Sequence, residues 1–119
     1  MIVSKFDKKT LFMRDGRVIF ISYEGLVLSS YYIWYITIID NEITLYSNDF
    51  YLDADKNEGI VKGFPYMKRW KCELKDINYS IYFEDKNNML TIEENKALLR
   101  KENKNHKNQL FAFIDIQKK

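Results

Sequence analysis

The chain has 119 residues, of which 46% are hydrophobic and 16% aromatic, and its formal net charge is only +2. This length suits one domain with one core, and this hydrophobic content excludes an intrinsically disordered chain. The near-balanced charge excludes a strongly acidic nucleic-acid mimic, and it is smaller than the positive excess of a typical DNA-binding protein. We therefore predict a single β-rich domain over residues 1–119.

The first predicted element is a β-hairpin, with arms Leu11–Arg14 and Arg17–Tyr23. The two residues between the arms, Asp15 and Gly16, accept the positive φ angles that a type I′ turn requires. Both faces of the second arm are apolar, which predicts an interior strand.

The next element is the uncharged run Leu26–Ile39, LVLSSYYIWYITII, which is rich in β-branched and aromatic residues. Such residues favour a strand that is covered on both faces, so the run is predicted to lie near the centre of the sheet. Fully extended it would be too long for a domain of this size, which predicts a bend near Ser29-Ser30.

Several shorter strands are predicted after this run. Alternating apolar and polar residues indicate half-buried strands with one wet face. The expected strands are Ile43–Ser47, Phe50–Leu52, Tyr66–Lys75, Ile77–Phe83, Met89–Ile92 and Leu110–Ile116. No internal repeat is visible in the sequence.

Residues 92–104 are predicted to form the one short helix. Thr91 and Glu94 match a capping box, and ENKALLRKEN contains good helix formers. The competing interpretation makes Lys96–Lys101 a further strand. The predicted fold class is mainly β, an antiparallel sandwich or partly closed barrel of seven or eight strands.

Side chains suited to catalysis or metal binding are sparse. Cys72 is the only cysteine and His106 the only histidine, so no intramolecular disulfide can form and no zinc finger is present. Asp53, Asp55 and Asn57 have the D-x-D-x-N spacing of a calcium loop, but Gly59 stands one residue too late for its sharp turn. We therefore expect no catalytic residues, no metal and no cofactor.

The N-terminal segment and the length of the apolar run bear on localisation. Residues 1–12, MIVSKFDKKTLF, carry charges where a signal peptide needs an apolar stretch. The longest uncharged apolar run falls short of the ~18 residues of a membrane-spanning helix. A cytoplasmic protein without membrane association is the resulting prediction.

Charge is arranged in blocks along the chain, with −5 over residues 36–60 and +4 over residues 61–75. Blocks of opposite sign favour recognition of a charged partner surface. We therefore predict a small non-enzymatic module that binds another protein, such as an inhibitor or immunity-type protein of bacterial or phage origin that docks on a toxin or host enzyme. The predicted partner-binding residues are Tyr51, Asp53, Asp55, Phe64, Arg69, Lys71, Lys75 and Tyr82.

Two other functions remain open at this stage. The face with Arg69, Lys71, Lys75 and Tyr82 could bind single-stranded nucleic acid by charge and stacking. A barrel could also enclose a small apolar ligand, since both faces of residues 18–23 and 31–39 are apolar. The oligomeric state is open, and an edge strand could pair two copies into a dimer.

Overall fold

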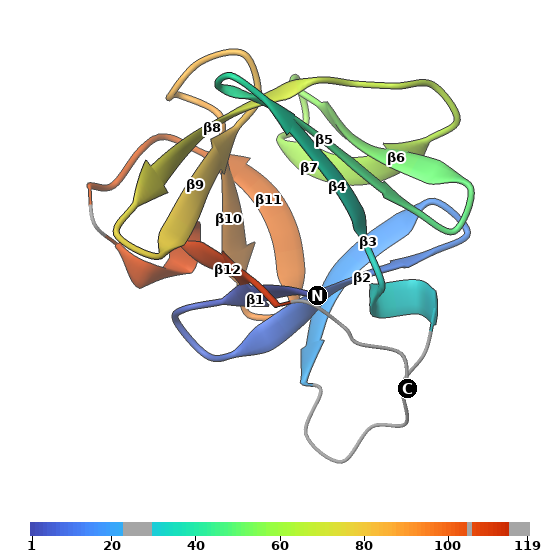
Figure 1. The fold of residues 1–119 in the computed structure, drawn as a ribbon, viewed down its shortest axis with the longest axis horizontal. Helices are drawn as coiled ribbons and strands as arrows, with labels where there is room; N and C mark the ends of the chain where they lie inside the picture. The colour runs from blue at the N-terminus through green and yellow to red at the C-terminus, as the bar shows by residue number, and fades with distance from the viewer. Residues whose placement is uncertain (23–29, 105, 115–119) are drawn as a thin grey trace.

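The protein is almost entirely β-structure, and its strands close into an antiparallel barrel (Figure 1). The computed structural model describes residues 1–22, 30–104 and 106–114. Those residues form two short 3-10 helices, η1 Ser30–Tyr32 and η2 Lys107–Gln109, and twelve strands. The strands are β1 Ile2–Ser4, β2 Lys9–Arg14, β3 Arg17–Ser22, β4 Tyr35–Ile39, β5 Glu42–Ser47, β6 Phe50–Asp55, β7 Ile60–Phe64, β8 Trp70–Lys75, β9 Asn78–Tyr82, β10 Met89–Glu93, β11 Lys96–Arg100 and β12 Phe111–Phe113.

The predicted Asp15-Gly16 hairpin is confirmed as β2–β3. Asp15 and Gly16 have φ angles of 53° and 78°, the left-handed values that the two-residue turn requires. Val18 and Phe20 of β3 are buried, whereas Ile19 and Ile21 on the other face are half-buried.

Two further hairpins, β6–β7 and β10–β11, join β2–β3 in a three-fold arrangement. The first residue of each second arm pairs with the third residue of the next one. Thus Arg17 lies opposite Lys62, Ile60 opposite Leu98 and Lys96 opposite Ile19. The chain is therefore built from three repeats of four strands, β1–β4, β5–β8 and β9–β12.

The same three-fold relation holds for the backbone hydrogen bonds between the hairpins. The N–H of the fourth residue in each second arm donates to the carbonyl of the residue that precedes the neighbouring second arm. These bonds run from Phe20 to Asn95 (2.9 Å), from Gly63 to Gly16 (2.8 Å) and from Leu99 to Gly59 (2.8 Å). Each hairpin thus donates to one neighbour and accepts from the other.

The other strands form the barrel wall. Strand β5 pairs with β8, β8 with β9, β9 with β12 and β12 with β1. Strand β4 pairs with β5 and, within the described residues, with no other strand. Side chains occupy the barrel interior, where Trp70, Phe20 and Phe111 are the largest that are fully buried.

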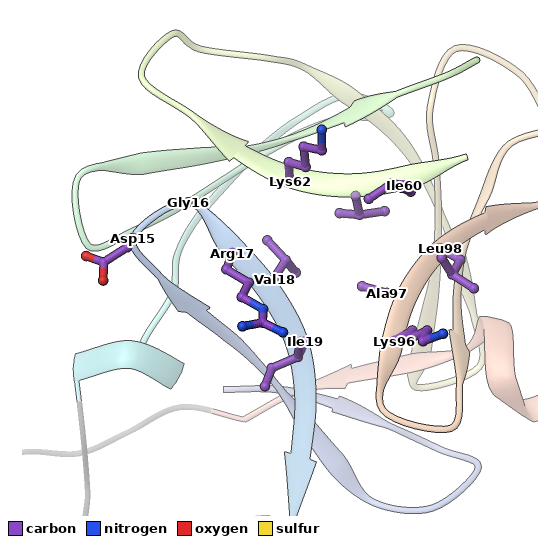
Figure 2. A pocket seen from close by; sticks show the side chains of 11 residues that line it. Asp15, Gly16, Arg17, Val18, Ile19, Ile60, Lys62, Lys96, Ala97 and Leu98 are labelled. Carbon is purple, nitrogen blue, oxygen red and sulfur yellow. The ribbon is translucent and has the colours of Figure 1, made fainter. Parts of the chain in front are cut away.

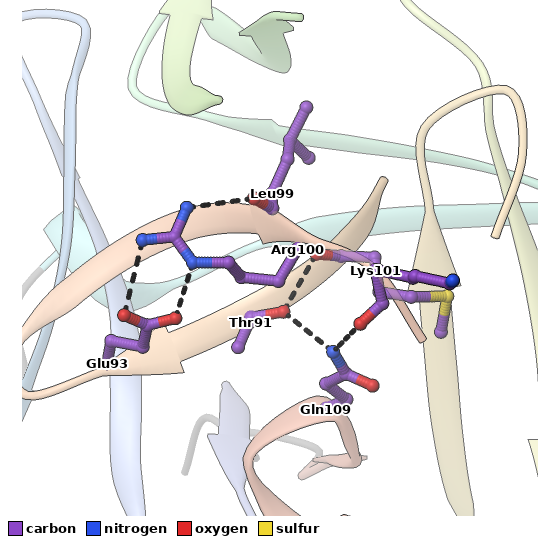
Figure 3. Close-up of polar contacts among 7 residues, drawn as sticks. Thr91, Glu93, Leu99, Arg100, Lys101 and Gln109 are labelled. Carbon is purple, nitrogen blue, oxygen red and sulfur yellow. Dashed lines mark hydrogen bonds and ion pairs between the residues drawn. The ribbon is translucent and has the colours of Figure 1, made fainter. Parts of the chain in front are cut away.

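Buried side chains join the barrel to the hairpins in each repeat. The indole N–H groups of Trp34 and Trp70 donate to the carbonyls of Leu11 (3.0 Å) and Leu52 (2.8 Å), which are the third residues of β2 and β6. In the third repeat Gln109 takes this place, and its amide donates to the Thr91 hydroxyl (3.2 Å) in β10 and to a backbone carbonyl (Figure 3). Two repeats thus use tryptophan at this position and the third uses glutamine, so this relation between the repeats is not evident from the sequence.

The helix predicted over residues 92–104 is wrong, and the competing strand is correct. Glu94, with a φ of 57°, and Asn95 make a two-residue turn between β10 and β11. Leu90 and Ile92 of β10, together with Ala97 and Leu99 of β11, alternate into the core. Burial of these four apolar side chains outweighs the helix propensity of the segment.

The central position predicted for Leu26–Ile39 is also wrong for the residues that are described. Only Tyr35–Ile39 form a strand, and in it Tyr35 (66% exposed) and Ile39 (65% exposed) face solvent. The chain turns at η1, which agrees with the bend predicted beside Ser30, and Tyr32 and Trp34 are buried. Residues 23–29 lie outside the described part of the structure.

Candidate functional site

A hollow of about 290 Å³ lies on the outer face of β4, β5 and β6 and beside the segment before β8. We call it the tyrosine hollow. Its wall combines three aromatic rings, two threonine hydroxyl groups, two apolar side chains and one cation. These lining residues are Tyr35, Thr37, Ile39, Thr44, Tyr46, Tyr51, Met67 and Arg69.

Strand register brings the three tyrosines together. Tyr35 lies directly opposite Tyr46, and Tyr46 lies directly opposite Tyr51. The ring centroids of Tyr35 and Tyr46 are 6.4 Å apart, and those of Tyr46 and Tyr51 are 4.8 Å apart. The rings thus form a continuous row across three strands, and cross-strand aromatic pairs of this kind also stabilise the sheet.

Alternation along the strands explains why these side chains face outward. On β5, Ile43 and Leu45 are fully buried, so Thr44 and Tyr46 between and after them point to the opposite face. Thr37 lies opposite Thr44 in the register, which places two hydroxyl groups beside the tyrosine row.

The polar groups of the hollow are hydrogen-bond donors at neutral pH. The hydroxyl of Tyr46 donates to Asp49 Oδ1 at 3.4 Å. Desolvation and the nearby Asp49 carboxylate raise the pKa of Tyr46 above its ordinary value of 10.0, so the phenol stays protonated. Arg69 adds a guanidinium group, which carries up to five N–H donors.

Three of the eight residues predicted to bind a partner lie in or next to the hollow. Tyr51 and Arg69 line it. Phe64, 37% exposed, lies directly opposite Tyr51 in the β6–β7 pair.

The other five predicted residues lie elsewhere. Lys71 is opposite Tyr82 on β8 and β9, and Lys75 forms an ion pair of 3.6 Å with Glu102. Asp53 accepts a hydrogen bond from the next backbone N–H, and Asp55 accepts two in the turn that follows β6. Asp55 therefore has a structural role in this turn, and the eight residues do not form one surface.

Sequence reasoning missed Tyr35, Thr37, Thr44 and Tyr46. Tyr35 and Thr37 were placed in the interior because the whole Leu26–Ile39 run was expected to be covered. The available signal was the alternation of Ile43–Ser47, in which Thr44 and Tyr46 share one face.

Other reactive groups lie away from the hollow. Cys72 is buried at 3% exposure, and desolvation by burial raises the pKa of its thiol. In the described part of the chain, no group of three or more His, Cys, Asp or Glu side chains is arranged to hold a metal ion. Nor does any helix there have the length and apolar character needed to span a bilayer.

No protein-family model matches the chain, and no curated protein matches it. Solved structures that share its fold include the following three. A GlcNAcα1-4Gal-releasing endo-β-galactosidase from Clostridium perfringens has a TM-score of 0.82 and 15% identity, and the match covers 98% of this chain and 32% of that one. This chain therefore spans about a third of the length of that enzyme.

The other two structures are similar in size to this chain. The designed three-fold symmetric protein ThreeFoil has a TM-score of 0.77 and 19% identity, over 97% of this chain and 96% of its own. SeviL, solved with asialo-GM1 saccharide bound, has a TM-score of 0.74 and 12% identity, over 93% of this chain and 91% of its own. Three repeats of four strands that together form a barrel and three hairpins constitute a β-trefoil. The similarity to these three solved structures establishes that fold for this chain.

A small binding module agrees with this fold in general terms. Of these three proteins, one is named as a glycosidase, one is a designed symmetric protein and one was solved with a saccharide bound. None is named as an inhibitor, an immunity protein or a nucleic-acid-binding protein, so these finer predictions gain no support.

Proposed function

We propose that the protein is a carbohydrate-binding module and that the tyrosine hollow is its binding site. The observation that carries the proposal is the row of Tyr35, Tyr46 and Tyr51 in an open hollow beside Thr37, Thr44 and Arg69. A pyranose ring has one face rich in C–H groups and a rim of hydroxyl groups. Tyrosine offers both an apolar ring and a polar end, so it suits such a ligand.

The distribution of polar groups supports the same ligand class. The threonine hydroxyls, the tyrosine hydroxyls and Arg69 can donate to or accept from sugar hydroxyl groups at the edges of the aromatic row. Sites of this kind combine apolar contact area with a few convergent polar groups. A fold shared with SeviL, whose structure contains a saccharide, adds support.

We further propose that the module binds its ligand without turnover. Glycoside hydrolysis needs two carboxylates on either side of the scissile bond, and the eight lining residues include no carboxylate. Release of product from a panel of chromogenic glycosides by the purified protein would contradict this part of the proposal.

A glycan array followed by calorimetry tests the binding proposal, with asialo-GM1 saccharide among the ligands. Tyr35→Ala is the preferred variant because Tyr35 is 66% exposed and its removal leaves the core intact. Loss of this aromatic contact should weaken binding by about tenfold.

Tyr66→Ala provides the matched control, because Tyr66 is 79% exposed and does not line the hollow. Its affinity for the same ligand should equal that of the unmodified protein. Failure of every glycan to bind at millimolar concentration, or equal loss in the two variants, would contradict the proposal.

A further inference from the structure

A second hollow, of about 530 Å³, lies where the three hairpins meet on the three-fold axis of the fold (Figure 2). We call it the axial bowl. Its wall is formed by residues 15–19, 60–62 and 96–98, that is, by the β2–β3 turn and the first three residues of β3, β7 and β11. Its size lies within the range of small-molecule sites.

Strand alternation divides the residues of the bowl into two sets. Val18, Val61 and Ala97 are buried at 7%, 2% and 3% exposure, so they point inward. The residues before and after each of them therefore point outward. Those six residues are the same ones that form the cross-strand pairs between the hairpins.

The identities of the paired residues make the bowl amphiphilic. One side pairs Arg17 with Lys62, so it carries two positive charges. A second side pairs Ile60 with Leu98 and is apolar. The third side pairs Lys96 with Ile19 and is mixed.

The positive charges of the bowl form no close ion pair with the described residues, although Asp53 lies opposite Lys62 and Glu93 opposite Lys96 in the strand register. None of the ion pairs among the described residues includes Arg17, Lys62 or Lys96. The one carboxylate that lines the bowl, Asp15, lies 3.9 Å from Arg14 instead.

The pairing of Arg17 with Lys62 places two like charges opposite each other on neighbouring strands. Such a pair destabilises a sheet, and the Asp53 carboxylate, which lies opposite Lys62 on β6, offsets part of this repulsion. Residue pairs that are unfavourable for folding tend to occur at functional sites. Figure 2 shows the Lys62 side chain extending from β7 away from Arg17, whose guanidinium lies beside Ile19, so the Lys62 ammonium group must turn towards Arg17 for both to contact one anionic group.

We propose that the axial bowl binds a small amphiphilic anion. Its carboxylate or sulfate group contacts Arg17 and Lys62, and its apolar body lies against Ile60 and Leu98. This site is separate from the tyrosine hollow, so each of the two proposals can be refuted without affecting the other.

The test is isothermal titration calorimetry with sodium octyl sulfate below its micelle concentration. Inorganic sulfate and 1-octanol serve as probes of the charged and apolar halves alone. Octyl sulfate should bind more tightly than either, and its affinity should fall when NaCl is raised because the charges of the rim are screened. Equal affinity for octanol or for inorganic sulfate would overturn the proposal.

Substitutions in the wall of the bowl test whether octyl sulfate binds there. The double variant Arg17→Gln with Lys62→Gln should weaken octyl sulfate binding by at least about tenfold. Leu98→Ser should weaken it without changing its salt dependence. Lys101→Gln, which removes an exposed lysine outside the bowl, should leave the affinity unchanged.

Thermal unfolding separates loss of binding from loss of folding. Neither side chain is buried, so the double variant should keep a melting temperature close to that of the unmodified protein. Unchanged octyl sulfate affinity in the folded double variant would refute the assignment. If that variant were unfolded, Leu98→Ser and Lys96→Gln would be measured instead, and unchanged octyl sulfate affinity in these two folded variants would refute the assignment.

Discussion

The ring of Trp70 meets the ring of Phe83 edge-on, with 5.2 Å between the ring centroids and 81° between the ring planes. Trp70 is fully buried, and its indole N–H reaches the Leu52 carbonyl in the second hairpin. The Trp70 side chain of β8 thus contacts both the segment after β9 and strand β6. The barrel and the hairpin are therefore expected to unfold together.

Replacement of Trp70 by phenylalanine should destabilise the protein by about 2 to 4 kcal/mol, because it removes buried volume and leaves the Leu52 carbonyl without its donor. Urea denaturation measures the change. Tyr66→Phe, at a residue 79% exposed, is the control and should change the free energy of unfolding by less than about 0.5 kcal/mol. Equal effects in the two variants would contradict the role of Trp70.

Replacement of Gly16 by alanine should destabilise the first hairpin by about 1 to 2 kcal/mol. Gly16 has a φ of 78°, and an added Cβ would lie 3.3 Å from the Gly63 carbonyl oxygen. Thermal unfolding gives the comparison with Asp15→Asn, which should be neutral because asparagine tolerates the φ of 53° at that residue. A neutral Gly16→Ala variant would show that the turn adapts without cost.

The side chains of Glu93 and Arg100 form an ion pair along the third hairpin, with Nε 2.6 Å from Oε2 and Nη2 3.2 Å from Oε1 (Figure 3), although Lys96 is the residue opposite Glu93 in the register. A double-mutant cycle with Glu93→Gln and Arg100→Met should give a coupling of about 0.5 to 1 kcal/mol, because this exposed pair is bidentate. The coupling should shrink in 1 M salt. Zero coupling would show that the ion pair between Glu93 and Arg100 contributes nothing to stability.

Glu73 should titrate below its ordinary pKa of 4.5, first because Lys86 donates a hydrogen bond to its carboxylate. Since the folded-state pKa is lowered, this pair stabilises the fold above the ordinary pKa of the carboxyl. The contribution is lost as pH falls through the lower, folded-state pKa. Carboxyl chemical shifts measured by NMR against pH should show the lowered pKa.

Lys86→Gln should return the pKa of Glu73 towards its ordinary value, whereas Lys101→Gln should leave it unchanged. Lys86 Nζ lies 2.8 Å from Glu73 Oε1, so loss of this ammonium group removes both the charge and the donor. A pKa of Glu73 that did not respond to Lys86→Gln would contradict the assignment of its cause.

Features set by adjacent residues were predictable from the sequence. The Asp15-Gly16 turn is one, because two residues alone provide the positive φ angles and the apolar arms follow from alternation. The β-rich class is another, since the content of β-branched and aromatic residues reflects the whole chain.

Features set by tertiary position were not predictable. Residues 92–104 favour a helix locally, and only the neighbouring hairpins make Ala97 and Leu99 core residues. Tyr35 belongs to an apolar run, but β4 pairs with one strand and leaves its outer face open. The tyrosine hollow needs three strands in register. The predicted partner-binding residues therefore include Tyr51 and Arg69 but neither Tyr35 nor Tyr46.

The cyclic hydrogen bonds of Phe20, Gly63 and Leu99 have a consequence for the dynamics of the protein. Opening any one hairpin breaks the hydrogen bond that it donates and the one that it accepts. Local opening of one hairpin is therefore coupled to opening of the other two. The three amide hydrogens should therefore exchange with deuterium at similar rates, through one shared cooperative opening.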